Sequence, residues 1–509
     1  MTTMSIATAS DLEIAAAPAR PLITPLMLAA GCVALADWLF YGWRIGISLA
    51  LFLAVLGIAG VAGNRVHAAR KIQMVMAALF VAGLLALIED VNALSVTVAA
   101  LATALFIIVI TAREASSWPW RMLEAATIPF RGPFQLVADL FKALQSMKGR
   151  VPEWLSMGSL VAWIVPLAAC FVFFSLFASA NPLIEYRLQQ IDVRAIFNLL
   201  DPTRIGFWIL LVCAIWPLLL RRAPGMRVWE VESRVTADNS DLEHLFGVQA
   251  VTRSLILFNA LFALQSALDL TYLWAGASLP DGMTHAHYAH RGAYPLIVTA
   301  LLAAGFVLIA MRPGGPAEQS RLIRPLVLLW TGQNVLLVIS SIFRLDLYVA
   351  AYSLTNLRLA AFLWMVLIAV GLLLMLIQIK LKKPNSWLVT ANAVSLALVL
   401  YGCCFINAPR LIAAYNVEHS REIDGVGSKL DLKYLFSLGP QVLPVLESRL
   451  QHIPALQPYV AGFRSDQDID AERRGPANWR GWGFRTWRLE RYLANNPATS
   501  PNPPTGDRG

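Results

Sequence analysis

The feature that most constrains this chain is a series of long apolar runs with few charged residues inside them. A segment of about 20 mostly apolar residues can cross the ~30 Å hydrocarbon core of a bilayer. Because backbone groups in hydrocarbon must form hydrogen bonds within their own segment, such runs predict helices. Eleven runs meet or approach this length, and they cover approximately residues 21–43, 45–64, 72–88, 91–112, 156–179, 205–220, 249–274, 292–311, 323–343, 357–379 and 387–408.

Composition agrees with this pattern. Hydrophobic residues make up 57% of the 509 residues and charged residues only 14%, whereas an ordinary soluble domain has about 25% charged residues. A soluble core cannot cover that much apolar surface, so we expect lipid to cover it. The predicted fold is an all-α integral membrane protein, a polytopic bundle of about 11 transmembrane helices within residues 21–408.

The distribution of Lys and Arg predicts the orientation of the chain. With the N-terminus inside, the inside loops each carry three to six basic residues and the outside loops at most three, as the positive-inside rule requires. The inside loops are then 64–71, 113–153, 221–243, 312–324 and 380–383. This pattern predicts a protein of the bacterial inner membrane with a cytoplasmic N-terminus and a periplasmic C-terminal tail.

The two ends of the chain differ from the membrane region. Residues 1–20 lack the positive segment and apolar core of a cleaved signal, and we expect a short disordered lead. Residues 409–494 predict a small helical tail, with two short helices separated by Gly439 and Pro440. Residues 495–509 are rich in Pro and Asn and predict a disordered end.

Two amphipathic segments lie outside the apolar runs. In 134–148, apolar side chains share one helical face and charged side chains lie largely opposite, which predicts either a helix in the inner interface or a cap packed on the bundle. Residues 184–200 repeat the pattern on the outer side. Near the C-terminus, Trp479, Trp482 and Trp487 alternate with arginines, which favours a membrane surface or an anionic partner. The alternative is a folded cap with tryptophans in its core.

One polar stripe is the strongest candidate binding site. If residues 344–358 form one helix, five polar side chains fall within an arc of about 120°, and they are Arg344, Tyr348, Tyr352, Thr355 and Arg358. Arginine and tyrosine together suit an anionic ligand or a lipid head group. The alternative is an interfacial belt of snorkelling arginines and aromatic residues, and a turn between the flanking spans would break the stripe.

Three carboxylates lie within or beside apolar runs. Asp37 and Asp269 interrupt spans, and Asp90 ends one. A carboxylate at membrane depth is costly and usually pairs with a partner that faces the bundle interior. Arg344 and Arg358 are the expected partners of these carboxylates. Such a cluster indicates either a substrate or ion cavity or purely structural ion pairs.

Other site chemistry is poorly supported by the sequence. His285, His287 and His290 are spaced unfavourably for a helical zinc site and have no nearby cysteine. Catalytic triads, phosphate-binding loops and dinucleotide motifs are absent from the sequence. We therefore predict no catalytic residue, no metal and no cofactor. The inside loops explain much of the net charge of +9, so nucleic acid is not an expected partner.

Two segments resemble a bacterial family of multi-pass membrane proteins, the domain of unknown function DUF4173, and its relative DUF4153. One contains Tyr288, Ala289, Gly292 and Tyr294, and the other contains Arg344, Tyr348, Leu354, Thr355 and Arg358. The resemblance extends over about 255–445. It implies a membrane location and a helical architecture and no reaction, and it suggests that the polar stripe is a hallmark of the family.

The sequence therefore favours a transporter-like or ligand-sensing protein with an outward-facing polar cavity. An envelope scaffold or signalling protein is the first alternative, with the tail and interfacial helices as contact surfaces for an envelope partner. A membrane enzyme acting on a lipid-linked substrate is the second, and it is disfavoured because only Asp346 and His290 could assist the arginines. The lipid bilayer is the partner common to all three.

Overall fold

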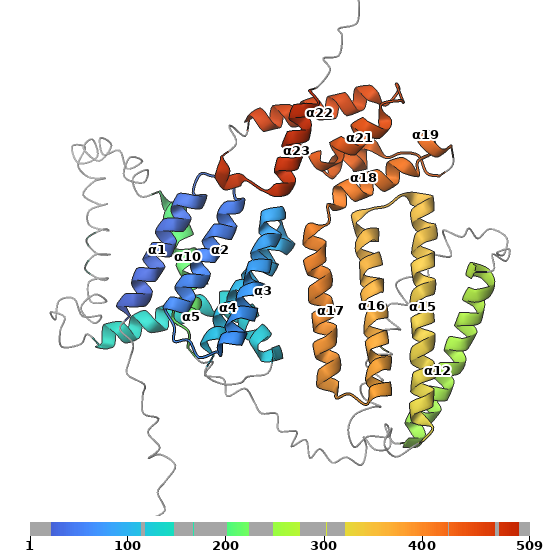
Figure 1. Ribbon diagram of the computed structural model, residues 1–509, viewed down its shortest axis with the longest axis horizontal. Coiled ribbons are helices and arrows are strands. Elements are labelled where there is room, and N and C mark those ends of the chain that lie inside the picture. The colour runs from blue at the N-terminus through green and yellow to red at the C-terminus, as the bar shows by residue number, and fades with distance from the viewer. Residues whose placement is uncertain are drawn as a thin grey trace, which may run out of the picture. The chain divides into compact units, whose positions relative to one another are not determined.

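The computed structural model describes residues 22–112, 118–146, 201–222, 248–274, 321–425, 427–473 and 478–497, together with positions 166, 170 and 302. All regular elements within these ranges are helices (Figure 1), which confirms the all-α prediction for this part of the chain. The chain divides into two compact units. The first comprises Met1–Leu87, Thr97–Gly225 and Asn478–Gly481, and the second comprises Ile88–Val96, Met226–Ala477 and Trp482–Gly509.

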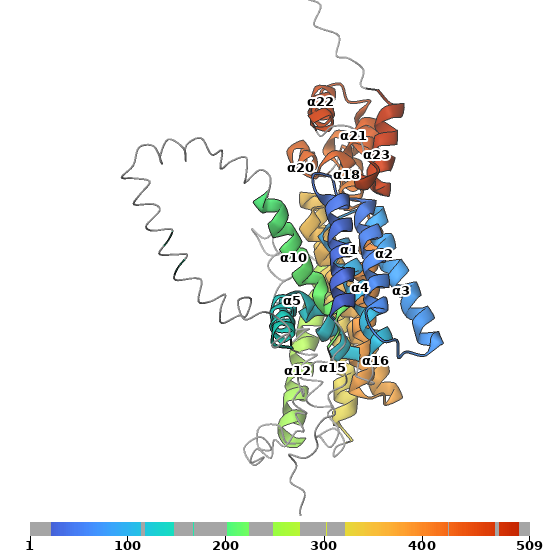
Figure 2. The ribbon, with the colours of Figure 1, turned by 90° about the vertical axis from the view of Figure 1, so that its left-hand side faces the viewer.

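The first unit contains steep apolar helices and one helix that lies across them. Its elements are α1 (Ile23–Phe40), α2 (Ile47–Ala62), α3 (Arg70–Glu89, to Leu87 in this unit), α4 (Ala93–Thr111, from Thr97), α5 (Trp118–Ser146), α10 (Pro202–Leu219) and the short η4 (Trp479–Gly481). Helix α10 packs against α1, α2 and α5. Figure 2 shows α5 nearly end-on beside the steep helices, and Figure 1 shows it lying across them.

Local sequence explains where α1 and α10 end and begin. Gly42 adopts a positive φ of 74° in the turn after α1, a conformation that only glycine adopts without strain. Asp201 is the N-cap of α10, and its side chain accepts hydrogen bonds from the backbone N–H groups of Thr203 and Arg204. Pro202 occupies the first helical position, where its missing N–H is not needed.

The membrane helices of the second unit follow one another along the chain. They are α12 (Val248–Asp269), the π-helical turn η2 (Leu270–Trp274), α15 (Ile323–Tyr352), α16 (Asn356–Leu381) and α17 (Asn385–Phe405). Helix α15 packs against both α12 and α16, and α17 packs against α16. Their common core consists of Val251, Leu255, Phe262, Ile323, Val327, Trp330, Leu337, Met375 and Leu388.

The C-terminal tail has a hydrophobic core of its own. Its helices are α18 (Ala408–Glu418), α19 (Arg421–Asp424), α20 (Leu432–Ser437), η3 (Pro440–Val442), α21 (Leu443–Leu450), α22 (Gln457–Arg473) and α23 (Phe484–Asn495). Helix α20 ends before Gly439, and η3 and α21 follow from Pro440. Fully buried side chains in this core include Ile412, Val417, Leu446 and Leu450.

Hydrogen bonds join the tail to the turn between α15 and α16. Asn416 on α18 accepts from the backbone N–H of Leu354 at 2.6 Å and donates to the Leu354 carbonyl at 2.9 Å. The Tyr434 hydroxyl accepts from the backbone N–H of Asn356 at 2.9 Å. The tail and this turn therefore lie at the same end of the second unit's membrane helices.

Among the described helices, eight are long and apolar enough to cross a membrane, namely α1, α3, α4, α10, α12 with η2, α15, α16 and α17. Helix α2 is apolar but has only 16 residues. The predicted spans 156–179 and 292–311, the outer amphipathic segment 184–200 and the lead 1–20 lie outside the described residues. Eight candidate spans are therefore shown, and the count of eleven stays a prediction.

The predicted start of the inner amphipathic helix, at residue 134, is wrong. Helix α5 begins at Trp118 and continues through Pro129 and Pro133. Proline inside a helix removes one hydrogen bond and commonly kinks it, but these two prolines do not end the helix. The face that contains Asp139 packs against α10 through Trp216, and the apolar face is exposed.

Candidate functional site

A buried ion pair joins α12 and α15 in the second unit. The Arg344 guanidinium contacts the Asp269 carboxylate, and their side chains are only 3% and 1% exposed. Gln265, one turn earlier on α12, donates a hydrogen bond to the same carboxylate at 2.9 Å. Of the three carboxylates singled out in the sequence, Asp269 is the one that the structure brings together with Arg344.

Helix geometry changes directly after Asp269. Residues Leu270–Trp274 form a π-helical turn, an uncommon geometry that is frequently found at functional sites. The Trp274 indole N–H donates to the Ser340 hydroxyl at 3.2 Å, and its ring packs edge-on against Phe343 at 5.0 Å. These contacts fix the π-helical turn beside the buried ion pair.

Amide side chains continue this polar track between the two helices. Asn259 donates to the carbonyl of Leu326 at 3.1 Å, across the α12–α15 interface. Gln333 donates in the opposite direction, to the Asn259 carbonyl at 3.2 Å. Asn392 on α17 instead bonds to the Leu388 carbonyl of its own helix. The amides on α12 and α15 therefore strengthen helix packing within an apolar core.

The polar stripe does not lie on one helix, so that part of the prediction is wrong. Ser353 adopts a φ of 66° and ends α15. Thr355 is the N-cap of α16, and its hydroxyl accepts a hydrogen bond from the Arg358 backbone N–H. This turn separates Arg344, which is buried against α12, from Arg358 at the start of the next helix.

Arg358 forms a compact cluster with two tyrosines at the turn. Its guanidinium donates to the carbonyls of Tyr352, at 2.5 Å, and Ser353. It also lies 4.5 Å from the ring centre of Tyr348 and 6.0 Å from that of Tyr352. Arg358 thus caps the end of α15, since cations favour the carbonyl end of a helix, and this geometry resembles an aromatic interfacial belt.

Asp37 and Asp90 have partners other than Arg344 and Arg358, which corrects the sequence expectation. Asp37 accepts from Arg204 at 2.7 Å and from the Trp208 indole N–H at 2.9 Å, both on α10. Its partners lie on α10, which begins more than 160 residues later in the sequence.

A second carboxylate, that of Asp201, supports the same end of α10 through hydrogen bonds. Asp201, its N-cap, accepts hydrogen bonds from the hydroxyls of Tyr41 and Thr203. The Tyr41 hydroxyl is the main cause that holds the pKa of the Asp201 carboxyl below its usual value, and Thr203 contributes next. The start of α10 is thereby tied to the end of α1.

Glu89 and Asp90 pair with arginines of α23 in the tail. Arg485 contacts Glu89 at 3.2 Å and Asp90 at 3.1 Å, and it donates to the Cys404 carbonyl at 3.0 Å. Arg488 contacts Glu89 at 3.0 Å. Sequence reasoning missed this cluster, although the alternation of Arg and Trp after residue 478 was a visible signal of an anionic partner.

Two of the three tryptophans of this segment are exposed, so the structure does not favour the alternative of a cap with tryptophans in its core. Trp479 and Trp487 are exposed, whereas Arg480 and Arg485 are buried. In the first unit, Arg480 lies 4.5 Å and 4.7 Å from the ring centres of Trp38 and Trp43. Arginine, with its weakly hydrated planar cation, is therefore the buried member of these aromatic contacts.

The histidines 285, 287 and 290 and the family-like residues Tyr288, Ala289, Gly292 and Tyr294 lie outside the described residues. Within the described ones, the second unit offers a buried carboxylate and guanidinium beside a π-helical turn. An intramembrane ion pair of this kind can change its interactions when an ion, a proton or an anion competes for one member. Around the Asp269–Arg344 pair, the described residues provide no nucleophile positioned beside a base.

Comparison with known proteins gives one match. A family described as a domain of unknown function, DUF4153, matches residues 74–448. This match supports the DUF4153 relationship and gives no support to DUF4173. No curated protein and no solved structure matches the chain.

Proposed function

This chain belongs to the DUF4153 family, and on that premise we propose that it is a transporter-like or ligand-sensing protein of the bacterial inner membrane. Its functional centre is the Asp269–Arg344 pair between α12 and α15. The observation that carries this proposal is the burial of both charges in helices long and apolar enough to span a membrane. Charged groups at that depth are costly and commonly mark ion or substrate pathways.

The π-helical turn supports the same assignment. It places an irregular backbone segment directly after Asp269, where a change of helix register would move the carboxylate relative to Arg344. Two arrangements of the pair, one closed and one open to an anion or cation, would provide the two states that transport or sensing requires.

For the orientation, we propose a cytoplasmic N-terminus and a periplasmic tail. The positive-inside distribution supports it. In the second unit, the tail contacts the α15–α16 turn, whereas Lys382 and Lys383 lie at the opposite end of α16. A reporter fused after Lys383 should therefore read cytoplasmic and one fused at Asn495 periplasmic. The same compartment for both would refute this orientation.

Water access distinguishes a functional centre from a purely structural ion pair. Ser340, which bonds to Trp274 beside the pair, is buried. In a chain whose five native cysteines are replaced, Ser340→Cys should react with a membrane-impermeant thiol reagent. Thr103→Cys is the matched control, because Thr103 is equally buried on α4 and bonds within its own helix. Equal lack of reaction at both positions would overturn the proposal.

An envelope scaffold is the second candidate, and the separate hydrophobic core of the tail favours it. A scaffold needs the tail surface and does not need water to reach Ser340. Labelling at Ser340 therefore separates the two functions.

A further inference from the structure

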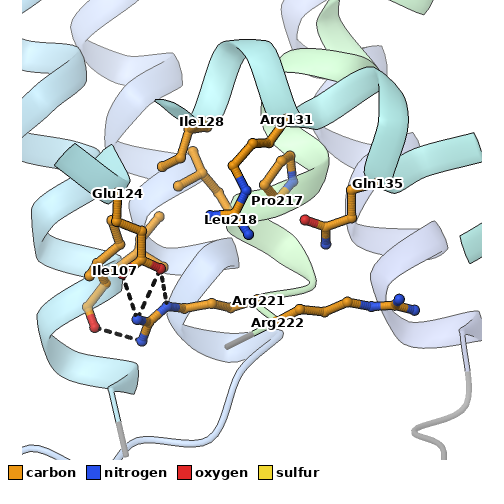
Figure 3. Close-up of a pocket in the computed structure, with 10 residues that line it drawn as sticks. Ile107, Glu124, Ile128, Arg131, Gln135, Pro217, Leu218, Arg221 and Arg222 are labelled. Carbon is orange, nitrogen blue, oxygen red and sulfur yellow. Dashed lines mark hydrogen bonds and ion pairs between the residues drawn. The ribbon is translucent and has the colours of Figure 1, made fainter. Parts of the chain in front are cut away.

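The first unit contains a small pocket between α4, α5 and α10 that three arginines line. Figure 3 shows Arg131 extending from α5 into the pocket, whereas Arg221 and Arg222, which follow α10, extend in opposite directions, Arg221 toward Glu124. The pocket has a volume of about 10 Å³, which suits a single water. A larger anion would therefore lie at its mouth, where the Arg222 side chain is 40% exposed.

Two of the three arginines already have carboxylate partners. Arg221 contacts both oxygens of Glu124 at 3.1 Å and donates to the Ile108 carbonyl at 2.8 Å. Arg222 contacts the buried carboxylate of Asp139. Arg221 is thus a fixed structural member of the pocket, and Arg222 has an exposed side available to a ligand.

Arg131 has no ion pair or hydrogen bond among the described residues, although it is half-buried and lines the same pocket. Arg221 pairs with Glu124 and Arg222 with Asp139, so Arg131 is the one of the three arginines whose positive charge has no partner carboxylate among the described residues. Guanidinium groups recognise phosphate oxygens through paired hydrogen bonds. A phosphodiester, which carries one negative charge and several acceptor oxygens, would balance this charge.

The apolar face of α5 identifies the source of the phosphodiester. Directly after Arg131, a shallow groove is lined by Pro133, Phe134, Val137, Ala138 and Phe141. Phe134, Val137 and Phe141 are exposed, and α5 lies across the steep helices in Figure 1 and is seen nearly end-on in Figure 2. A helix in this orientation, with an apolar face and adjacent cations, is typical of a membrane interface.

We propose that Arg131 binds the phosphodiester of an anionic phospholipid, whose acyl chain covers the Phe134–Val137–Phe141 face of α5. The lipid head group lies at the mouth of the pocket, and its charge neutralises Arg131. Basic pockets between membrane helices bind anionic head groups in the same manner. This site is separate from the Asp269–Arg344 pair and does not depend on its function.

The test compares lipids with the full-length protein purified in detergent. Phosphatidylglycerol should raise the melting temperature, and phosphatidylcholine with the same acyl chains should raise it much less. Inorganic phosphate alone should not reproduce the effect, because it lacks the acyl chain. Equal stabilisation by the two lipids, or by inorganic phosphate, would overturn the proposal. This comparison uses only the unsubstituted protein, so it does not depend on whether a variant folds.

Substitutions locate the site. Arg131→Gln should weaken phosphatidylglycerol binding about tenfold, measured by native mass spectrometry, because a charge-assisted contact is lost. Lys142→Gln is the matched control, since it removes the same charge from an exposed position on α5 outside the pocket, and it should leave binding unchanged. Equal weakening by both substitutions, or no weakening by Arg131→Gln, would contradict a specific site.

Discussion

Arg344 on α15 and Asp269 at the end of α12 neutralise each other in an ion pair that is almost completely shielded by protein. Removal of two charges from water costs several kcal/mol per ion, and only a close partner offsets that cost. The pair therefore ties α12 to α15, and loss of either member leaves an isolated charge. This dependence makes its two residues the most sensitive positions that we identify.

Arg358 should behave differently from Arg344, although both belong to the predicted stripe. Its guanidinium contacts backbone carbonyls and tyrosine rings, so Arg358→Leu loses hydrogen bonds to uncharged carbonyls and a cation–π contact, and it leaves no buried carboxylate of the described residues without a partner. We expect a loss of about 1–2 kcal/mol in the free energy of unfolding, measured by thermal unfolding in detergent. Neither Asp37→Asn nor Asp269→Asn should rescue it. Rescue by either change would show that Arg358 neutralises a buried carboxylate.

The attachment of α23 should depend on Arg485. Its buried guanidinium contacts Glu89, Asp90 and the Cys404 carbonyl, and Arg485→Leu leaves Glu89 with only the exposed Arg488. We expect faster hydrogen exchange across 484–495. Arg491→Leu is the control, because Arg491 on the same helix packs over the ring of Trp487, and it should leave exchange unchanged. Similar exchange in both variants would refute the role of Arg485.

Alkaline pH should loosen the packing of Tyr492 in the tail. Burial, followed by the hydrogen bond to Glu447, raises the pKa of Tyr492 from 10.0 to about 12. Because the folded pKa lies above the ordinary value, the stabilisation is complete below pH ~10 and is lost as pH rises toward about 12. Tyrosinate absorbance should reveal a late-titrating group that disappears in Tyr492→Phe. Titration of all tyrosines near their ordinary pKa would contradict this environment.

The apolar runs predicted the helices well because burial in lipid requires long, internally bonded segments. All nine runs within the described residues are helical, including the short run 205–220 and the run that contains Arg253 and Asp269. Boundaries were less accurate. Helix α15 continues beyond Phe343 to Tyr352, because nothing in that stretch prevents helix formation before the positive φ of Ser353.

The candidate site was predictable only in part. Helical periodicity places residues on one face, but it does not reveal which distant segment supplies a partner. Arg204 and Arg485 lie 167 and 395 residues from Asp37 and Asp90, and no local pattern encodes those separations. Thr355 was the missed local signal, since a Thr three residues before Arg358 is a common helix N-cap and marks the turn that divides the stripe.

The stability of Asp269 and Arg344 variants, alone and combined, tests the central claim most directly. Arg344→Leu should lower the free energy of unfolding by about 3–5 kcal/mol, because it leaves the Asp269 carboxylate without its cation. The double variant Arg344→Leu and Asp269→Leu should recover most of that loss, because both charges are then absent. Thermal unfolding of purified protein in detergent gives the stability of the parent, the two single variants and the double variant. If Arg344→Leu alone unfolds at the temperature of the parent, or if the double variant is no more stable than the single one, the two residues do not neutralise each other in the membrane core.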